Sequence, residues 1–389
     1  MIVDVVIEQR FYRCAEHKFW TDNAFPYDFW TRYLHVFQSV NIVARVALVD
    51  KPHSDWKRVD GQNVNVVVLP SYIGPWQFLL SLSKIIRVLR ARKTLTRAVI
   101  YRIPGILSTL YHFTAQANNK PYAAEVVGDP ADVFAKGASK SVIRPLIKSV
   151  FVKMLKWQCL GAASISYVTE VSLQRRYPPN PLAFHTHYSS IQLEDNDFHI
   201  RPQYALTQPL KLICIGNLTQ PYKGCDFMLQ TLAQLKQQGL AFTLRWVGGG
   251  YLQAQMQELA KQLGIAQYVT FVGNLADRQA IRDELDKADI FVLSSRQEGL
   301  PRVLIEAMAR SLVCVATNVG GVPELLPENF IVERDNQAQL GQVLSALAGY
   351  SSTQLLASSA QNHQKARQYE NSALVARRNA MYQHLLETM

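Results

Sequence analysis

The sequence comprises 389 residues, 48% of them hydrophobic and 18% charged, which is the composition of a globular protein. A chain of this length usually folds as two domains with substantial cores. No run of about 18 apolar residues occurs, and the N-terminus has neither a basic region nor a cleavage site. We therefore expect neither a transmembrane helix nor a signal peptide.

The charge and the cysteines suggest a compartment and a class of partner. Residues 1–190 carry 24 Lys and Arg against 12 Asp and Glu, whereas residues 191–389 carry 17 against 18. The basic excess of the first half favours a polyanion near it: a membrane surface, a lipid-phosphate acceptor or nucleic acid. Nucleic-acid motifs are absent, so we predict no nucleic-acid partner. The five cysteines form no C-x-x-C pair, which suits a cytoplasmic protein, with peripheral attachment to the inner membrane face left open.

The first half of the chain alternates strand and helix patterns. A strand over Val3–Ile7 precedes a segment without glycine that is crowded with aromatic residues, where we expect a helix over Tyr27–Gln38. Its aromatic side chains could form an acceptor wall or pack on the core. Further strands are predicted at Ile42–Val49, Val64–Leu69, Ala98–Tyr101 and Ser164–Thr169. We assign residues 1–190 to an N-terminal, acceptor-side domain.

Two segments of this half combine basic and apolar residues at helical spacing. They are Gln77–Arg92 and Lys136–Cys159. A basic amphipathic helix can lie on an anionic membrane surface, but the same pattern also describes a solvated helix face. Both interpretations stay open.

The second half begins with a polar, irregular segment, 191–209, which we interpret as a linker. Over 210–370 the strand and helix patterns again alternate, which predicts a parallel sheet covered on both faces. The predicted fold class is therefore α/β, with two Rossmann-like domains facing across a cleft at the carboxyl ends of their strands.

The stretch Ser294–Ala309 holds Glu298 and Glu306, separated by seven residues. Pro301 stands where a helix would begin, after a buried strand pattern. The unpaired amides of the first turn, about Leu300 to Leu304, would then make an anion site with the helix dipole. The pattern suggests a nucleotide-sugar pocket in which amides bind a diphosphate, one carboxylate binds ribose and the other binds the sugar.

Five segments in this order resemble the retaining glycosyltransferases of family 4, which have the GT-B fold. They are IGNLTQPYKGCD, LRWVGGG, VTFVGNL, ADIFVLSSRQEGLPRVLIEAMA and ATNVGGVPELL, and they span nearly all of residues 210–330. The resemblance implies glycosyl transfer with retention and a nucleoside-diphosphate sugar as donor. It further implies no obligatory metal, a saccharide or lipid-linked acceptor, and a final helix, 371–389, that packs back on the first domain.

The resemblance also assigns roles to residues. Lys223 would meet the donor diphosphate, Glu298 the transferred sugar and Glu306 the ribose hydroxyls. Asn217 stands where the family usually has an arginine, and Arg302 could compensate for it. The full expected donor-binding set is Asn217, Lys223, Gly248, Gly249, Val272, Gly273, Asn274, Glu298, Gly299, Leu300, Arg302, Val303, Leu304 and Glu306.

The N-terminal half departs from the family. The usual glycine-rich loop is missing, and Gly128–Asp129 occupies the place of a histidine. Asp129 is the candidate catalytic residue there, touching acceptor or donor sugar; alternatively it forms a turn with Pro130 or caps the next helix. The triplet 195–197 and the His185/His187 pair lack the context of a metal site, so no metal is predicted. A GT-B sugar-nucleotide epimerase and a non-catalytic nucleotide- or polyanion-binding protein remain alternatives.

Overall fold

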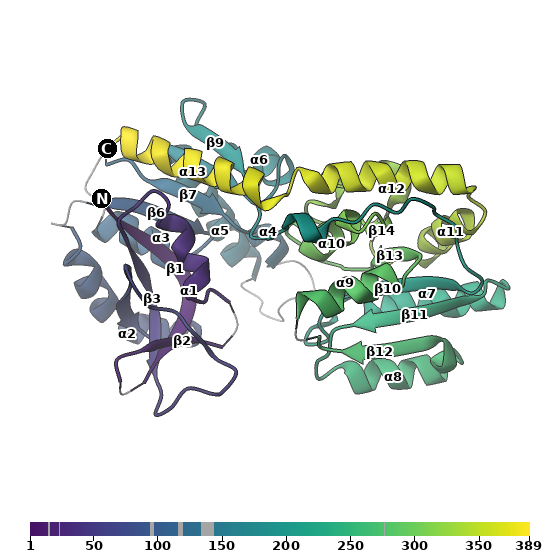
Figure 1. Cartoon of the computed structure of the whole chain (residues 1–389). Coiled ribbons are helices and arrows are strands. Elements are labelled where there is room, and N and C mark those ends of the chain that lie inside the picture. Colours follow the sequence, from purple (N-terminus) through teal and green to yellow (C-terminus); the bar gives the residue numbers. More distant parts are fainter. Residues whose placement is uncertain (15, 23, 94–96, 116–119, 134–143, 276) are drawn as a thin grey trace. The chain divides into compact units, whose positions relative to one another are not determined.

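The computed structural model describes residues 1–14, 16–22, 24–93, 97–115, 120–133, 144–275 and 277–389 (Figure 1). Contacts divide the chain into two compact units. Unit 1 comprises Met1–Tyr188 and Val375–Met389, and unit 2 comprises Ser189–Leu374.

Unit 1 is built on a mainly parallel sheet in the order β5-β3-β1-β6-β7-β8-β9, with β2 and β4 added antiparallel beside the end of β1. Its strands are β1 (Ile2–Arg13), β2 (Phe19–Thr21), β3 (Ser39–Leu48), β4 (Lys57–Arg58), β5 (Val64–Pro70), β6 (Ala98–Ile103), β7 (Ala123–Val126), β8 (Ser164–Tyr167) and β9 (Phe184–His187). Its helices are α1 (Tyr27–Trp30), α2 (Gly74–Arg90), α3 (Ile106–Thr114), α4 (Pro130–Val133), α5 (Arg144–Gly161) and α6 (Ser172–Arg176).

Several predicted elements of unit 1 have the wrong bounds, and the differences at β1 and α1 change the interpretation most. β1 is more than twice as long as expected, because after an irregularity in its register residues Arg10–Arg13 pair with β3 and the last two also with β2. The expected helix over Tyr27–Gln38 ends early: α1 gives way to a 3-10 turn over Thr31–Tyr33. Trp30 and Tyr33 are fully buried, so these two aromatic side chains pack on the core.

The sheet of unit 1 is covered on both faces. Helices α2, α3 and α5 contribute Ile85, Leu89, Leu107, Tyr111, Leu155 and Cys159 to one core. On the other side, Tyr382 of the C-terminal helix α13 (Asn371–Glu387) stacks on Tyr33, and both hydroxyls donate to buried Glu125 of β7. Arg102 of β6 pairs with the same carboxylate.

Unit 2 holds a sheet in the order β12-β11-β10-β13-β14-β15, with every pairing parallel. Its strands are β10 (Leu210–Ile215), β11 (Phe242–Val247), β12 (Val269–Gly273), β13 (Ile290–Leu293), β14 (Val313–Thr317) and β15 (Ile331–Val332). Its helices are α7 (Cys225–Gln237), α8 (Gln253–Gln262), α9 (Arg278–Asp286), α10 (Arg302–Ala309), α11 (Gln337–Ala348) and α12 (Ser352–Arg367). Each unit is thus an α/β domain around a parallel sheet, which confirms the predicted class.

The segment 191–209 does not run free between the units. The Arg201 guanidinium donates to the carbonyls of Leu285 and Ala288, and the buried Tyr204 hydroxyl accepts a hydrogen bond from Val313 N–H at 2.9 Å. The segment is therefore a strap on unit 2. The sequence suggested a linker because the segment is polar. Its partners lie about 80 to 110 residues away in the chain, so no local pattern indicates them.

None of the helices in the described ranges combines the length and the apolarity that a bilayer span requires.

Candidate functional site

The first element of the candidate site is the loop that follows β10. It ends in a 3-10 turn, Pro221–Lys223, and Gly224, with a positive φ of 70°, directly precedes α7 as its N-cap. A Cβ at Gly224 would lie 1.9 Å from the Ser294 carbonyl oxygen, so only glycine lets the loop pack this closely on the end of β13. The Ser294 hydroxyl also donates to the Lys223 carbonyl at 3.1 Å. Lys223 is thereby fixed at the carboxyl end of the sheet.

Glu298 follows β13 and meets Lys223 there. Lys223 Nζ lies 2.7 Å from Glu298 Oε1, and the Ser295 hydroxyl donates to the same oxygen at 2.7 Å. The side chains of Lys223 and Glu298 are 15% and 11% exposed, so both groups are within reach of a ligand at the surface. The structure therefore brings together two of the three residues predicted to be catalytic.

Arg296 is a residue of this region that sequence reasoning missed. Its guanidinium binds Asp226 through two hydrogen bonds of 2.8 and 2.9 Å and Asp335 through a third of 2.7 Å. Its backbone N–H donates to the Tyr222 carbonyl, beside Lys223. Arg296 thus clamps the Lys223 loop to the loop that leads to Glu298. No local motif predicts this role, because the two partners of Arg296 are 70 and 39 residues away in the chain.

The glycines after β11 tie neighbouring strand ends together. Gly248 has a φ of 119°, and a Cβ there would lie 2.3 Å from the Gly216 carbonyl oxygen. Its N–H donates to the Gly273 carbonyl at 2.8 Å, and the Gly249 N–H donates to Asn274 Oδ1 at 2.7 Å. The predicted set therefore lies together at the carboxyl ends of β11 and β12, at one edge of the sheet. It comprises Gly248, Gly249, Val272, Gly273 and Asn274.

The first turn of α10 presents free amides, as expected, but the set differs from the predicted one. The Leu304 N–H donates to the Pro301 carbonyl at 3.1 Å, so it is not available to an anion. Within the described residues, the N–H groups of Gly299, Leu300, Arg302 and Val303 have no hydrogen-bond partner. The prediction of a free Leu304 amide was wrong because a proline before the helix still supplies a carbonyl that closes the first turn.

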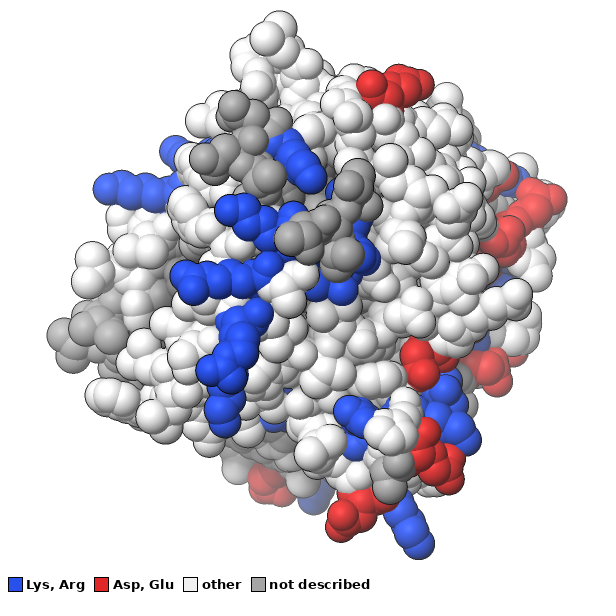
Figure 2. All heavy atoms as spheres, turned by 90° about the vertical axis from the view of Figure 1, so that its left-hand side faces the viewer, with Lys and Arg blue, Asp and Glu red and all other residues white. Residues whose placement is uncertain are grey.

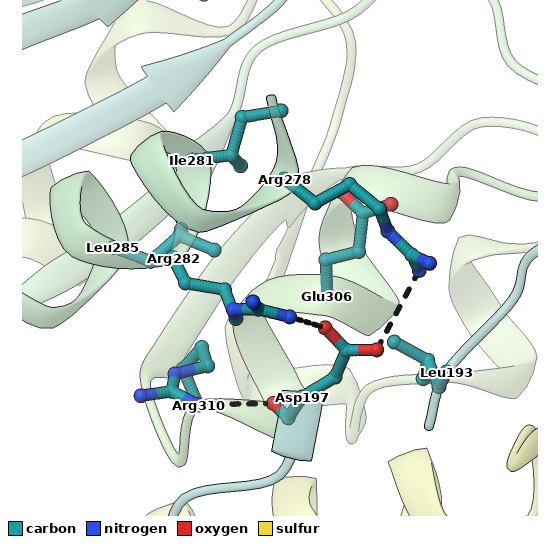
Figure 3. Close-up of a pocket in the computed structure, with 8 residues that line it drawn as sticks. All are labelled: Leu193, Asp197, Arg278, Ile281, Arg282, Leu285, Glu306 and Arg310. Atoms are coloured by element: carbon teal, nitrogen blue, oxygen red, sulfur yellow. Dashed lines mark hydrogen bonds and ion pairs between the residues drawn. The ribbon is translucent and has the colours of Figure 1, made fainter. Parts of the chain in front are cut away.

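Glu306 lies on α10 and lines a small cavity of about 30 Å³ (Figure 3). The lining residues are Leu193, Asp197, Arg278, Ile281, Arg282, Leu285, Glu306 and Arg310. Figure 3 shows Arg278, Arg282 and Arg310 turned toward Asp197. The first two pair with its carboxylate, and Arg310 donates to its carbonyl at 3.2 Å. Arg278 and Arg282 are thus engaged by Asp197, and the Arg310 guanidinium pairs with the Asp286 carboxylate.

The carboxylate of Glu306 itself makes no hydrogen bond to another residue of the described ranges. Burial raises the pKa of Glu306, and the positive charges of Arg302 and Arg278 oppose that shift. A partly buried carboxylate that accepts no hydrogen bond from the described residues is costly for the free protein. The same carboxylate is well suited to accept hydrogen bonds from a ligand.

Asn217 lies in the loop between β10 and Lys223. Asn217 Oδ1 accepts hydrogen bonds from Thr219 N–H and Oγ, which closes a local turn. Arg302 is exposed and acts electrostatically on Glu306. The expectation that Arg302 supplies the missing cation beside Lys223 therefore finds no support in its surroundings.

Asp129 is held inside unit 1. The side chain is buried, and its Oδ1 accepts hydrogen bonds from the Ala131 N–H at 2.7 Å and from the Tyr177 hydroxyl. Its Oδ2 pairs with Arg176. This arrangement matches the turn and capping alternative and shows both oxygens engaged within unit 1.

Within the described residues, no group of three or more His, Cys, Asp and Glu side chains is arranged to hold a metal ion.

Comparison with known proteins finds a family match for much of unit 2. Residues 209–349 match the model for glycosyl transferases group 1. The chain carries a group 1 glycosyltransferase domain. It is accordingly a transferase-class enzyme, and the recognition of the family from its motifs is confirmed at the level of group 1.

Named relatives of this glycosyltransferase come from bacteria. It is 26% identical over 322 residues to protein CapJ of Staphylococcus aureus, which covers 82% of this chain and 80% of CapJ. It is 32% identical over 160 residues to a putative colanic acid biosynthesis glycosyltransferase, WcaL, of Escherichia coli, covering 39% of each chain. The crystal structure of Anabaena Alr3699/HepE in complex with UDP and glucose matches with a TM-score of 0.62 at 14% identity, covering 99% of this chain and 98% of that one. The last likeness supports the GT-B fold alone.

Proposed function

We propose that this glycosyltransferase moves a sugar, with retention of configuration, from a nucleoside-diphosphate sugar to a saccharide or lipid-linked acceptor. The product would belong to a bacterial surface polysaccharide or glycolipid. The single observation that carries the proposal is the Lys223–Glu298 pair beside the free amides of α10, at the carboxyl ends of parallel strands. Ligands of open α/β sheets bind at this edge.

The donor diphosphate is assigned to Lys223 and to the first turn of α10. A lysine ammonium is a compact charge for phosphate oxygens, and unpaired amides at a helix start bind anions together with the helix dipole. The free N–H groups of Gly299, Leu300, Arg302 and Val303 supply such donors. As the bond between the sugar C1 and the phosphate oxygen breaks, the same groups stabilise the growing negative charge.

The nucleoside is assigned to the region that Gly249 and Asn274 border on one side and Glu306 borders on the other. Two ribose hydroxyls would donate to the Glu306 carboxylate, which has no donor from the described residues. The Gly248–Gly249 and Val272–Asn274 backbone would border the base. Glu298 would then face the transferred sugar from the other side of the diphosphate.

The transfer step follows from these assignments. The acceptor hydroxyl oxygen bonds to C1 on the face that the diphosphate leaves, and its proton passes to the departing phosphate oxygen. Glu298 then orients the sugar and is not itself glycosylated. Asn217 provides no cation, so Lys223 carries more of the leaving-group charge than it would beside an arginine.

The relatives support the substrate class. WcaL is named for colanic acid biosynthesis, and the HepE structure contains UDP and glucose. By analogy, we expect a nucleoside diphosphate and a hexose to fit this site and a bacterial glycan to be the acceptor class.

The test is donor turnover by the full chain with panels of UDP-, GDP- and ADP-sugars. Release of the nucleoside diphosphate is followed by coupled assay and the anomeric configuration of the freed sugar by NMR. The proposal predicts turnover of one nucleotide class with retention. Inverted product would refute retention, an epimerised donor would favour the epimerase, and binding without turnover would favour a non-catalytic protein.

A further inference from the structure

One face of the unit 1 sheet is covered by three helices that contain no acidic residue. Neither α2, α3 nor α5 includes Asp or Glu, and residues 61–124 hold eight Lys and Arg without a single carboxylate side chain. Figure 2 looks onto the side of unit 1 where α2 and α3 lie in Figure 1. Lys and Arg form a band down this face, while Asp and Glu lie away from the band, toward the right and the bottom of the view.

Helix α2 also exposes large apolar side chains at its start. Trp76 is 78% exposed, Leu79 56% and Leu80 82%, and Ile73 just before the helix is 66% exposed. Contiguous apolar exposure of this kind is rare on a surface that faces only water. The N-terminal part of α2 is therefore built to contact something other than water.

The apolar and basic residues of α2 share one side of the helix. Trp76, Leu80, Lys84 and Arg87 follow one another at intervals of three or four residues, which places them on one face of an α-helix. Lys84 and Arg87 are exposed, whereas Ile85 and Leu89 on the opposite side are fully buried in the core. The exposed face is thus apolar in its first half and basic in its second.

The neighbouring helices extend the same surface. Phe113 of α3 is 71% exposed and stacks on Trp157 of α5 with ring centroids 5.2 Å apart. Leu160 is 51% exposed, and Lys153 and Lys156 are exposed on α5. The expected basic residues Lys136 and Lys140 lie outside the described residues.

We propose that this surface, the α2–α5 face, docks the protein on a bilayer that contains anionic phospholipids. It comprises Ile73, Trp76, Leu79, Leu80, Lys84, Arg87, Phe113, Lys153, Lys156, Trp157 and Leu160. The apolar start of α2 enters the boundary between headgroups and acyl chains, where a Trp ring is well placed. The lysines and arginines lie against the phosphates, to which juxtamembrane basic residues are attracted.

The apolar residues decide between a bilayer and a soluble polyanion. A polysaccharide or a nucleic acid would engage the basic band through its charges and would leave the Leu80 and Leu79 side chains in water. A bilayer buries them. The inference does not rest on the proposed function, because docking is measured without donor or acceptor.

The experiment is cosedimentation of the full chain with vesicles of phosphatidylcholine alone or mixed with phosphatidylglycerol. We expect binding to the mixed vesicles only, and quenching of Trp fluorescence by lipids brominated on the acyl chains. The double variant Trp76→Ser/Leu80→Ser should lose at least about tenfold in partition coefficient through lost apolar burial. Lys84→Gln/Arg87→Gln should lose a similar factor, with a reduced dependence on salt.

Matched controls remove comparable groups from elsewhere. Leu182→Ser/Ile200→Ser removes two apolar side chains that are 92% and 69% exposed, and Lys261→Gln/Lys287→Gln removes two exposed charges from unit 2. Both should bind as the unchanged protein does. Absence of binding to anionic vesicles would overturn the proposal. So would a Trp76→Ser/Leu80→Ser variant that binds normally while the Lys84→Gln/Arg87→Gln variant does not, since that result describes a purely electrostatic polyanion site.

Discussion

Lys223 and Glu298, 75 residues apart in the chain, meet through Nζ and Oε1 at 2.7 Å. The contact exists because β10 and β13 are neighbouring parallel strands whose carboxyl ends share one edge of the sheet. Each residue is the other's ion-pair partner in the free protein, and each is assigned to a different part of the donor. The pair therefore couples the phosphate end of the site to the sugar end.

Replacing Lys223 with Gln should reduce kcat/KM by about 10² to 10³, the range seen when one stabilising donor is removed from a developing oxyanion. Turnover of the donor is the measurement. Lys211→Gln, which removes an exposed lysine near the start of β10, is the control and should leave kcat/KM unchanged. A Lys223→Gln enzyme with normal kcat/KM would remove Lys223 from the mechanism.

The ion pair predicts non-additive effects. Glu298→Gln leaves Lys223 without its carboxylate but keeps the Ser295 hydroxyl as a neighbour. The combined variant should lose less activity than the product of the two single losses, because residues in direct contact do not act independently. Kinetics of the two single variants and the double variant decide this. Strictly multiplicative losses would mean that the two groups work separately.

The pKa of Glu306 predicts how stability depends on pH. Because burial raises this pKa, the folded protein favours the neutral carboxyl more than the unfolded chain does. The resulting stabilisation is complete below the unfolded pKa and is lost as pH rises through the folded pKa. Glu306→Gln should therefore raise the melting temperature of the ligand-free protein at neutral pH, and by less at acidic pH.

The same variant should bind the nucleotide less well. Each hydrogen bond to a charged carboxylate contributes about 1.5–3 kcal/mol, so losing the charge should weaken nucleotide binding at least about tenfold. Calorimetric titration measures this, with the exposed Glu258→Gln as control. Lower stability at neutral pH combined with unchanged nucleotide affinity would show that Glu306 is a structural residue.

Gly224 and Gly264 form a matched pair for testing the Lys223 loop. Their φ angles are 70° and 68°, so alanine suffers similar backbone strain at both. Only at Gly224 would the new Cβ meet an atom within 4 Å, the Ser294 carbonyl oxygen at 1.9 Å. Gly264→Ala should cost about 1 kcal/mol of unfolding free energy and keep activity. Gly224→Ala should cost at least about 2 kcal/mol more and lose donor turnover. Equal effects would mean that the loop relaxes freely.

Asp129 should act on stability more than on donor binding. Asp129→Ala removes the ion pair with Arg176 and the hydrogen bonds that the Tyr177 hydroxyl and the Ala131 N–H donate to the carboxylate. We expect a loss of about 2–4 kcal/mol of unfolding free energy in urea, with nucleotide affinity unchanged because the nucleotide is assigned to unit 2. Unchanged stability together with lost turnover would restore Asp129 as a catalytic residue.

The site in unit 2 could be predicted largely from the sequence because its signals are local. Pro301 marks the start of α10, the strand before it is an uninterrupted apolar run, and alternation of strand and helix predicts which ends share an edge. Parallel topology then brings Lys223 to Glu298 without further information. Side-chain patterns alone could not find Arg296, whose role depends on Asp226 and Asp335.

The structure of unit 1 was less predictable because its contacts join residues far apart in the sequence or join polar side chains. The end of β1 is a strand only because β2 and β3 pair with it, and its sequence shows no clear alternation. The buried Glu125 depends on Tyr382, 257 residues away, to complete its hydrogen bonds. The exposed apolar start of α2 was missed because the expected helix began only at Gln77, after Trp76.

The most direct test of the account is a calorimetric titration of the full chain with UDP, GDP and ADP in the presence of a chelator, repeated with Lys223→Gln and Glu306→Gln. The account predicts that one nucleoside diphosphate binds without added metal and that each substitution weakens it at least about tenfold. Binding that both substitutions leave unchanged would place the nucleotide elsewhere and contradict the assignment of this site.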